Sequence, residues 1–390
     1  MISSRELDIV LFGATGIAGT YVVEELHRAS EGLRWGIAGR SADKLRRTLR
    51  AAAKNLDLQE DALDSVPIIV ADVADEASLV SMAQRTRLVL NTVGPYRFFG
   101  RPVVKACVDS STHHIDISAE PQYMEQMQLE FYEEARKKGI MILNACGFAS
   151  IPAETCLSYM RKHFQGDLEE VESYLLIKQG SLGMKVNFGT WKSIIHMLAH
   201  ASELADLRRQ NREKLFTKPL PQRLSRLTRR YALFWTDVAK SWCVPYMGCD
   251  RSVMLRSEMF RHQLCGLKPF PGIFSAGTVN RGGPTKEQAL GCSFSLTVRG
   301  RGWKEKLAET GDRHSGKMNH SITIRLDGPD PAYVATSTCM VQVAVVVLKE
   351  KKKMVVEGGV LSPGVALDGT SYLDRIQQRG FHITVVSQRG

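Results

Sequence analysis

Three glycines near the N-terminus are spaced so that they could hold a diphosphate. The loop reads Gly13-Ala14-Thr15-Gly16-Ile17-Ala18-Gly19, and it directly follows an apolar run over 8–12. In such a loop the first glycine allows a tight turn, the second lets backbone N–H groups approach a pyrophosphate, and the third lets the next helix pack closely on the strand. The helix N-terminus adds unpaired N–H donors. We therefore expect a dinucleotide-binding loop whose contact residues are Gly13, Ala14, Thr15, Gly16, Ile17 and Gly19.

The end of the second expected strand distinguishes the two nicotinamide dinucleotides. An NAD site usually has an acid about 20 residues beyond the glycines, where it binds the ribose 2′-hydroxyl. This chain has Arg40 and Ser41 there, with Lys44 one helical turn further on, and no acid occupies the position that NAD sites use. A guanidinium can form paired hydrogen bonds to a 2′-phosphate, and a hydroxyl can add another. We therefore expect NADP rather than NAD; the alternative is a solvated arginine that caps the next helix.

Further candidates follow the third and fourth expected strands. Ligands in doubly wound sheets lie outside the carboxyl ends of the strands, so side chains in these loops can reach a cofactor. Asp72 follows the third strand, where it borders the adenine pocket or caps the helix that begins near Asp75. Gly94 and Pro95 follow the fourth strand and form a turn that we expect to contact the cofactor.

Tyr96 and Glu120 are the two candidates for catalysis. Tyr96 follows the turn at Gly94 and would stand near the nicotinamide; the alternative is a packed aromatic side chain without a chemical role. Asp116 and Glu120 lie at the end of the fifth expected strand, at the same edge of the sheet. Glu120 either orients the substrate or favours the N-terminus of the helix that begins at Pro121.

Alternating strands and helices must position these residues. Short apolar runs and helical patterns alternate through the first 150 residues, which predicts right-handed crossovers and an α/β fold with a Rossmann-type doubly wound parallel sheet. The expected strands cover 8–12, 34–38, 67–71, 88–93, 114–117 and 140–145, and the expected helices cover 43–53, 76–85, 102–109 and 121–138.

A chain of 390 residues predicts two domains. We assign 1–152 to the nucleotide domain, because Pro152 begins a new helix toward Phe164. Strand patterns at 171–177, 292–299 and 321–326 predict a second α+β domain over 153–330, a region that is also the candidate surface for a homodimer. In the C-terminal segment, 331–390, the apolar run 332–348 predicts a buried helix rather than a membrane span.

The net charge of +11 is concentrated in the second domain. A basic stretch covers 208–240, and within it 208–230 holds nine Lys or Arg and one acid. Leucines at helical spacing over 219–235 predict a basic amphipathic helix that lies on an anionic membrane surface or packs on the domain. Nucleic acid is disfavoured because no recognised binding module accompanies the charge.

Cysteine spacing and the N-terminus exclude two further classes. The eight cysteines are scattered singly, so we expect reduced, mostly buried thiols and no metal site. The N-terminus has no apolar signal segment, so we do not expect secretion.

Several segments together resemble the animal saccharopine dehydrogenase-like oxidoreductases, a family that includes bacterial trans-acting enoyl reductases. The resemblance implies a Rossmann domain, a second α+β domain and a nicotinamide cofactor. It is carried by Gly13–Gly19, Ala38–Ser41, Gly94–Gly100, Asp116–Glu120, Gly147–Pro152, Gly189–Trp191, Gly283–Thr285, Tyr333–Thr336 and Gly358–Gly364.

The resemblance also implies an activity and a location. It points to an NADP-dependent oxidoreductase that reduces a carbonyl or an activated double bond in a lipid-like substrate, at a lipid droplet or the cytosolic side of a membrane. Members of the family commonly have an acid where this chain has Ala149, and glycine where it has Ala119. A methyl group cannot accept a proton or a hydrogen bond. The alternative is therefore a non-catalytic, cofactor-binding protein at a membrane or lipid droplet.

Overall fold

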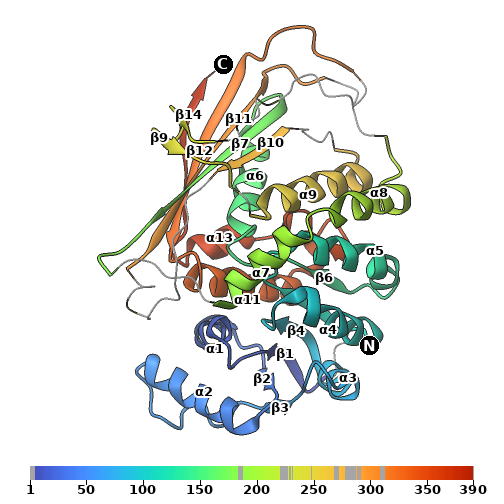
Figure 1. The fold of residues 1–390 in the computed structure, drawn as a ribbon, viewed down its shortest axis with the longest axis vertical. Coiled ribbons are helices and arrows are strands. Elements are labelled where there is room, and N and C mark those ends of the chain that lie inside the picture. Colours follow the sequence, from blue (N-terminus) through green and yellow to red (C-terminus); the bar gives the residue numbers. More distant parts are fainter. Residues whose placement is uncertain are drawn as a thin grey trace.

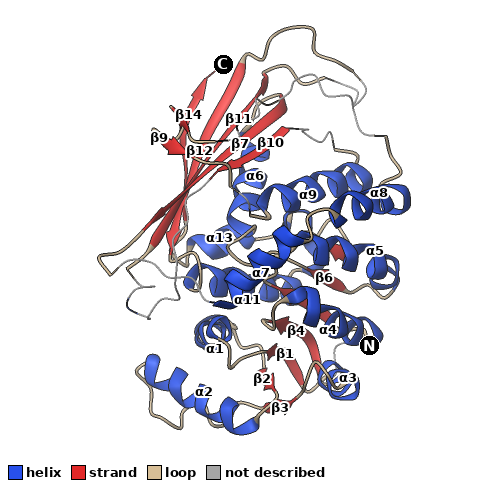
Figure 2. Ribbon diagram, viewed as in Figure 1, coloured by secondary structure: helices blue, strands red, loops and turns tan. Residues whose placement is uncertain are grey.

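The computed structural model contains two large sheets, with helices around and between them, and a small two-stranded sheet (Figure 1). The structure describes residues 5–182, 188–219, 227, 230, 232–246, 248–267, 272–276, 287, 291–307 and 312–389. Figure 2 shows the first sheet enclosed by helices and the second sheet more open.

The first sheet has seven parallel strands in the order β13-β6-β5-β4-β1-β2-β3. The run from β3 to β6 follows the strand order of the Rossmann fold, which confirms the predicted doubly wound sheet. The strands are β1 (Leu7–Phe12), β2 (Trp35–Gly39), β3 (Ile68–Val70), β4 (Thr86–Asn91), β5 (His113–Asp116), β6 (Met141–Leu143) and β13 (Gly359–Leu361).

Helices cover both faces of this sheet because its strands are apolar on both sides. In β1, Ile9 and Leu11 belong to one buried cluster, and Val10 and Phe12 belong to another. This division follows the alternation of side chains along a strand. The first cluster contains residues of α1 (Ile17–Ala29), α2 (Ala42–Asn55) and α11 (Val334–Lys349), and the second contains residues of α3 (Glu76–Gln84), α4 (Tyr96–Asp109) and α5 (Pro121–Lys137).

Two elements of this region differ from the predictions. Helix α4 begins at Tyr96 rather than at 102, and Pro102 lies inside it. Strand β13 was not predicted, because three residues after a turn carry too little pattern to identify a strand.

The second sheet has five strands in the order β10-β7-β11-β12-β14, and all of its pairs are antiparallel except β10 with β7. Together with α6 (Ile151–His163), which packs on one face, it confirms the predicted α+β region. Its strands are β7 (Asp167–Lys178), β10 (Gly272–Ala276), β11 (Ser293–Trp303), β12 (His320–Pro329) and β14 (His382–Arg389).

The C-terminal segment contributes to both sheets. Helix α11 is the predicted buried helix; it packs on α1, and its residues join a cluster that extends from Ile9 in the first sheet to Leu326 in the second. Strand β13 then enters the first sheet and β14 enters the second. No helix within the described ranges has both the length and the apolar composition that a bilayer crossing requires.

The remaining elements lie beside the two sheets. They are α7 (Phe188–Ala199), α8 (Glu203–Leu215), α9 (Asp250–Cys265), the short helices η2 (Lys351–Lys353), α12 (Pro363–Leu367) and α13 (Tyr372–Gln377), and the hairpin of β8 (Phe234–Thr236) and β9 (Ser241–Cys243).

Candidate functional site

The glycine loop has a geometry that only glycine permits at two positions. Gly13 has φ +90°, and a Cβ there would lie 2.8 Å from both Thr92 Oγ1 and Val93 Cγ2. A Cβ at Gly19 would lie 2.3 Å from the Gly13 carbonyl oxygen. These close approaches bring the start of α1 against the end of β1, as the sequence predicts.

The start of α1 provides the donors that a diphosphate needs. Gly16 is the N-cap residue and has no capping side chain, and the first N–H groups of a helix lack intrahelical partners. A Cβ at Gly16 would have only the Gly13 oxygen nearby, at 3.4 Å, so it would project into space that the loop leaves open. Thr15, Gly16 and Ile17 are exposed beside this space, whereas Ala14 is buried. The loop therefore fits a dinucleotide diphosphate.

Thr92 fastens the glycine loop to the loop after β4. Its hydroxyl donates to the carbonyl oxygens of Phe12, at 3.1 Å, and Gly13, at 3.2 Å. This contact lies between β1 and β4, where the strand order reverses and doubly wound sheets bind ligands. Sequence reasoning missed Thr92, although its place directly after β4 is a usable signal.

Arg40 stands at the carboxyl end of β2, as predicted. Its side chain is exposed and makes no hydrogen bond or ion pair with the described residues, so its guanidinium is available to a ligand. Ser41 is the residue that caps α2, accepting from the Lys44 N–H at 3.4 Å. The alternative in which Arg40 caps this helix is therefore wrong. Lys44 is exposed one turn further on.

Asp72 does not cap helix α3. The N-cap is Asp75, whose carboxylate accepts from the N–H groups of Ala77, at 3.1 Å, and Ser78, at 3.2 Å. Asp72 instead accepts from the Ala74 N–H at 3.1 Å and is half-buried. Its place beside the adenine stays a prediction, as do the cofactor contacts of Gly94 and Pro95.

Tyr96 is buried and its hydroxyl already has a partner. The hydroxyl donates to the Asn91 carbonyl oxygen at 2.9 Å, and the ring packs against Tyr123 with centroids 5.6 Å apart. Burial raises the pKa of this phenol well above its ordinary value, and the nearby charge of Asp116 adds to the effect. The phenol therefore stays protonated at neutral pH. These contacts favour packing over catalysis for Tyr96.

Glu120 caps helix α4 rather than the helix at Pro121. Its carboxylate accepts from the N–H groups of Tyr96, at 3.0 Å, and Arg97, at 2.8 Å. A third donor is the Ser193 hydroxyl of α7, at 2.8 Å. No side-chain cap bond forms at α5. The carboxylate thus positions the start of α4 and contacts α7, and the catalytic role of Glu120 stays a prediction that these contacts do not favour.

Asp116 holds three segments together at the carboxyl edge of the sheet. The carboxylate accepts from Asn144 Nδ2 at 2.7 Å, from the Tyr123 hydroxyl at 3.0 Å and from the Ala145 N–H at 3.1 Å. It also accepts the N–H and the hydroxyl of Ser118. The residue is fully buried, so the cluster is a structural anchor for the loops after β5 and β6.

The loop at Ala149 is tied to two other elements. The Phe148 N–H donates to Thr336 Oγ1 of α11 at 3.2 Å, and the Ala149 carbonyl accepts from Cys249 Sγ, beside α9, at 3.3 Å. Ala149 itself is half-buried and offers no side-chain acceptor.

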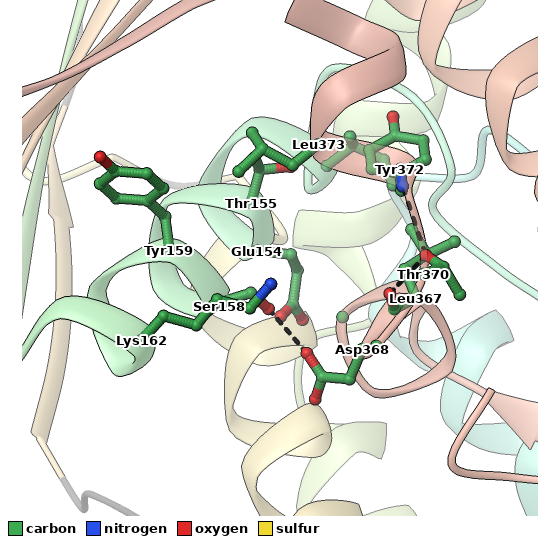
Figure 3. A pocket seen from close by; sticks show the side chains of 13 residues that line it. Glu154, Thr155, Ser158, Tyr159, Lys162, Leu367, Asp368, Thr370, Tyr372 and Leu373 are labelled. Carbon is green, nitrogen blue, oxygen red and sulfur yellow. Dashed lines mark hydrogen bonds between the residues drawn. The ribbon is translucent and has the colours of Figure 1, made fainter. Parts of the chain in front are cut away.

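A small cavity of about 40 Å³ lies between α6, α12 and α13 (Figure 3). Glu154, Ser158 and Asp368 point toward one another there, and the Ser158 hydroxyl donates to Asp368 at 2.9 Å. None of its lining residues comes from the glycine loop, so this cavity is separate from the dinucleotide site.

The predicted amphipathic helix over 219–235 is wrong where the structure describes it. Residues 219, 227, 230, 232 and 233 are not helical, and Phe234 begins strand β8; the rest of this interval lies outside the described residues. Arg230 ion-pairs with Glu172 at 2.9 Å, and its guanidinium stands 4.7 Å from the Phe234 ring centroid. These contacts place the Arg230 side chain between Glu172 of β7 and the Phe234 ring of β8.

Comparison with known proteins supports the cofactor and the fold. The saccharopine dehydrogenase NADP binding domain family matches residues 9–143, the region that holds the glycine loop and Arg40. An apo saccharopine dehydrogenase (L-Glu forming) from Saccharomyces cerevisiae shares the fold, with a TM-score of 0.54 and 13% identity, over 98% of this chain and all of that one.

Relatives match over nearly the whole length. The human saccharopine dehydrogenase-like oxidoreductase is 36% identical, and a Caenorhabditis elegans protein named lipid droplet localized protein is 31% identical, each over 98% of both chains. A Mycobacterium tuberculosis protein named as a trans-acting enoyl reductase is 28% identical over 96% of both chains. The chain therefore belongs to the saccharopine dehydrogenase-like oxidoreductase family, and its cofactor is NADP.

Proposed function

We propose that this protein is an NADP-dependent oxidoreductase that reduces a carbonyl or an activated double bond in a lipid-like substrate. The observation that carries the proposal is the glycine loop at the point where the strand order reverses, with Arg40 exposed at the end of β2. The bound cofactor supplies the hydride. The names of the mycobacterial and nematode relatives support a lipid-like substrate.

An apolar surface beside the loop after β4 supports the same substrate class. Phe98 and Phe99 are exposed in the first turn of α4, directly after the Gly94–Pro95 turn. Trp191, Ile195 and Leu198 are exposed on α7, and His196 of that helix packs on the Phe98 ring at 4.9 Å. Acyl chains favour such a surface because its burial removes apolar area from water.

The roles that we assign to the described residues of this site are to bind and orient, and water supplies the proton that accompanies the hydride. The N–H groups at the start of α1 and the Arg40 guanidinium hold the phosphates. Thr92 fixes the loop after β4 beside the glycine loop, and Glu120 fixes the start of α4. Both loops are therefore rigidly held where the nicotinamide end of a bound cofactor is expected.

The proposal is tested by measuring NADPH consumption with enoyl thioesters and ketoacyl thioesters, each with a short and a long acyl chain. We expect turnover that rises with acyl-chain length, because the added chain buries apolar surface at Phe98 and Trp191. Phe98→Ser with Trp191→Ser should remove this dependence on chain length and leave NADPH affinity unchanged. Tight NADPH binding without turnover on any of these substrates would contradict the proposal.

A non-catalytic, cofactor-binding role is the second candidate. It is favoured by the engagement of Tyr96 and Glu120 in packing and capping, and by the lack of an acceptor at Ala149. Ala149→Asp separates the two: new or strongly increased NADPH oxidation in this variant would show that the natural chain lacks a proton-transfer or orienting group. Equal NADPH oxidation by the natural protein and by Ala149→Asp would mean that Ala149 gives no support to the non-catalytic role.

Contact with an anionic membrane or droplet surface through 208–235 belongs to the same proposal. The hairpin of β8 and β9 supports it, since Trp235 lies opposite Trp242 and the two are 51% and 59% exposed. Leu233 and Val244 are exposed beside them. Tryptophan favours such an interface because its ring is apolar and its N–H is polar.

Substitution of both tryptophans tests this contact. Trp235→Ala with Trp242→Ala should reduce the share of protein that floats with vesicles of phosphatidylcholine and phosphatidylserine. Val70→Ala, which removes an exposed apolar side chain at the end of β3, serves as the control and should have no effect. Equal flotation of all three proteins would rule out the hairpin as the contact.

A further inference from the structure

One face of the second sheet carries a row of basic side chains. In the register of the sheet, Arg301 of β11 lies opposite Ser321 of β12, and Ser321 lies opposite Arg389 of β14. Directly paired side chains of antiparallel strands share one face. Arg299 is two residues from Arg301 on the same strand, so it shares that face as well. The sheet therefore sets three arginines around one serine hydroxyl.

This row faces away from helix α6. The opposite face of β11 carries Gly300, where an added Cβ would lie 2.4 Å from Met160 Sδ of α6. Val298, on the same side as Gly300, is fully buried, whereas Arg299 is only half-buried. Figure 1 shows α6 against one side of these strands. The basic row is thus on the open side of the sheet.

The basic row lines a hollow of about 570 Å³. This volume falls in the range of roughly 300–1,000 Å³ that is usual for small-molecule sites. Lys317 adds a fourth cation just before β12. The neighbouring residue is held in place, because Trp303 Nε1 donates to the Gly316 carbonyl at 2.9 Å, and the Trp303 ring also stacks on His314. No carboxylate stands among the described residues that line the hollow.

The cations of the hollow are largely without partners. The side chains of Arg299, Lys317 and Arg389 make no hydrogen bond or ion pair with the described residues. Arg301 pairs through Nη2 with the buried Glu170 of β7, but its Nε is buried and has no hydrogen-bond partner. On β7, Glu170 and Glu172 lie opposite Arg301 and Arg299, so the four cations outnumber two carboxylates. A buried donor without a partner is costly unless a ligand satisfies it.

We propose that this hollow binds a phosphate group. Guanidinium groups form paired, charge-assisted hydrogen bonds with phosphate oxygens, and the Ser321 hydroxyl adds a neutral donor between Arg301 and Arg389. The phosphate belongs to a soluble compound or to the headgroup of a phospholipid surface. The site is separate from the glycine loop and does not depend on the proposed reaction.

Calorimetric titration of the full chain with inorganic phosphate tests the soluble source. Saturating NADPH is present, so that the glycine loop and Arg40 do not contribute. Arg299→Gln and Arg389→Gln should each weaken binding about tenfold, because each removes charge-assisted hydrogen bonds and neither breaks an existing ion pair. Arg325→Gln is the control: it removes a cation of β12 that pairs with Asp327 outside the hollow.

Flotation with vesicles of phosphatidylcholine and phosphatidic acid, against phosphatidylcholine alone, tests the headgroup source. Each substitution in the hollow should lower vesicle affinity about fivefold, and Arg325→Gln should not. An effect of Arg299→Gln and Arg389→Gln in either experiment supports the site and identifies the source. Unchanged binding in both experiments, or an equal loss with Arg325→Gln, would overturn the proposal.

Discussion

Glu120 stabilises the start of helix α4 from 24 residues away in sequence. Glu120→Ala leaves the Tyr96 and Arg97 N–H groups without their acceptor, so it should lower the free energy of unfolding by about 1–3 kcal/mol. Glu120→Gln keeps one acceptor oxygen, so its free energy of unfolding should fall by less than that of Glu120→Ala. Urea unfolding measures both. Unchanged stability together with lost NADPH oxidation would instead assign Glu120 to catalysis.

Glu154 should make stability depend on pH. Burial raises the pKa of its carboxyl to about 7, although Arg261 and the Ser257 hydroxyl act to lower it. Glu258 and Asp368 also face this group. An acid with a raised pKa binds its proton more tightly in the folded state, so the stability that it contributes is full below pH 4.5 and is lost as the pH rises through about 7.

Glu154→Gln removes this titration. Between pH 4.5 and pH 7, the free energy of unfolding of the natural protein should fall by on the order of 3 kcal/mol relative to that of the variant. Unfolding free energies measured across this range check the sign and the size. Glu60→Gln, at an exposed position, is the control. Parallel stability curves for the natural protein and Glu154→Gln would contradict the raised pKa.

At the residue scale, the sequence predicts which residue types gather at the carboxyl edge but not what they contact. Arg40 is recognisable because its position follows a known spacing from the glycines. The partners of Glu120 and Asp116 come from α4, α7 and the loop after β6, and no local pattern records such distant contacts. Their capping and anchoring roles therefore required the structure.

At the scale of elements, two glycines of one loop should respond differently to substitution. Gly19→Ala places a Cβ 2.3 Å from the Gly13 oxygen, so it should destabilise the fold by about 1–3 kcal/mol. Gly16→Ala meets only one atom, at 3.4 Å, and should fold normally but weaken NADPH binding by filling the space beside the N–H donors. Thermal unfolding and NADPH titration separate the two effects. Full NADPH affinity in Gly16→Ala would contradict this site.

At this scale the sequence predicts the helices and strands whose apolar residues follow a clear local pattern, and it misses elements that depend on distant contacts. Six of the seven strands of the first sheet were predicted, as was the buried helix α11, and most of these elements carry clear apolar runs. Helix α4 begins earlier than predicted because its cap is supplied by Glu120 rather than by its own sequence. The interval 219–235 has leucines at helical spacing, but its described residues are not helical, and Arg230 among them forms an ion pair with Glu172 of β7 that no local pattern predicts.

At the scale of the whole molecule, the chain returns to each sheet after leaving it. The sequence predicts a nucleotide domain, an α+β region and a C-terminal segment, but it does not reveal that β13 completes the first sheet while β14 completes the second. Strand pairing between distant segments leaves no local signal. Helix α11 explains why both sheets share one core, since its residues pack between α1 and the second sheet.

We propose that the molecule binds NADP through the α1 N-terminus and Arg40. Titration with NADPH and with NADH tests it most directly, in the natural protein, Arg40→Ala and the control Arg46→Ala, which removes an exposed arginine of α2. We predict that the natural protein prefers NADPH and that Arg40→Ala alone loses about tenfold or more of NADPH affinity with NADH affinity unchanged. A natural protein that binds both equally, or an Arg40→Ala variant that weakens both alike, would contradict the account.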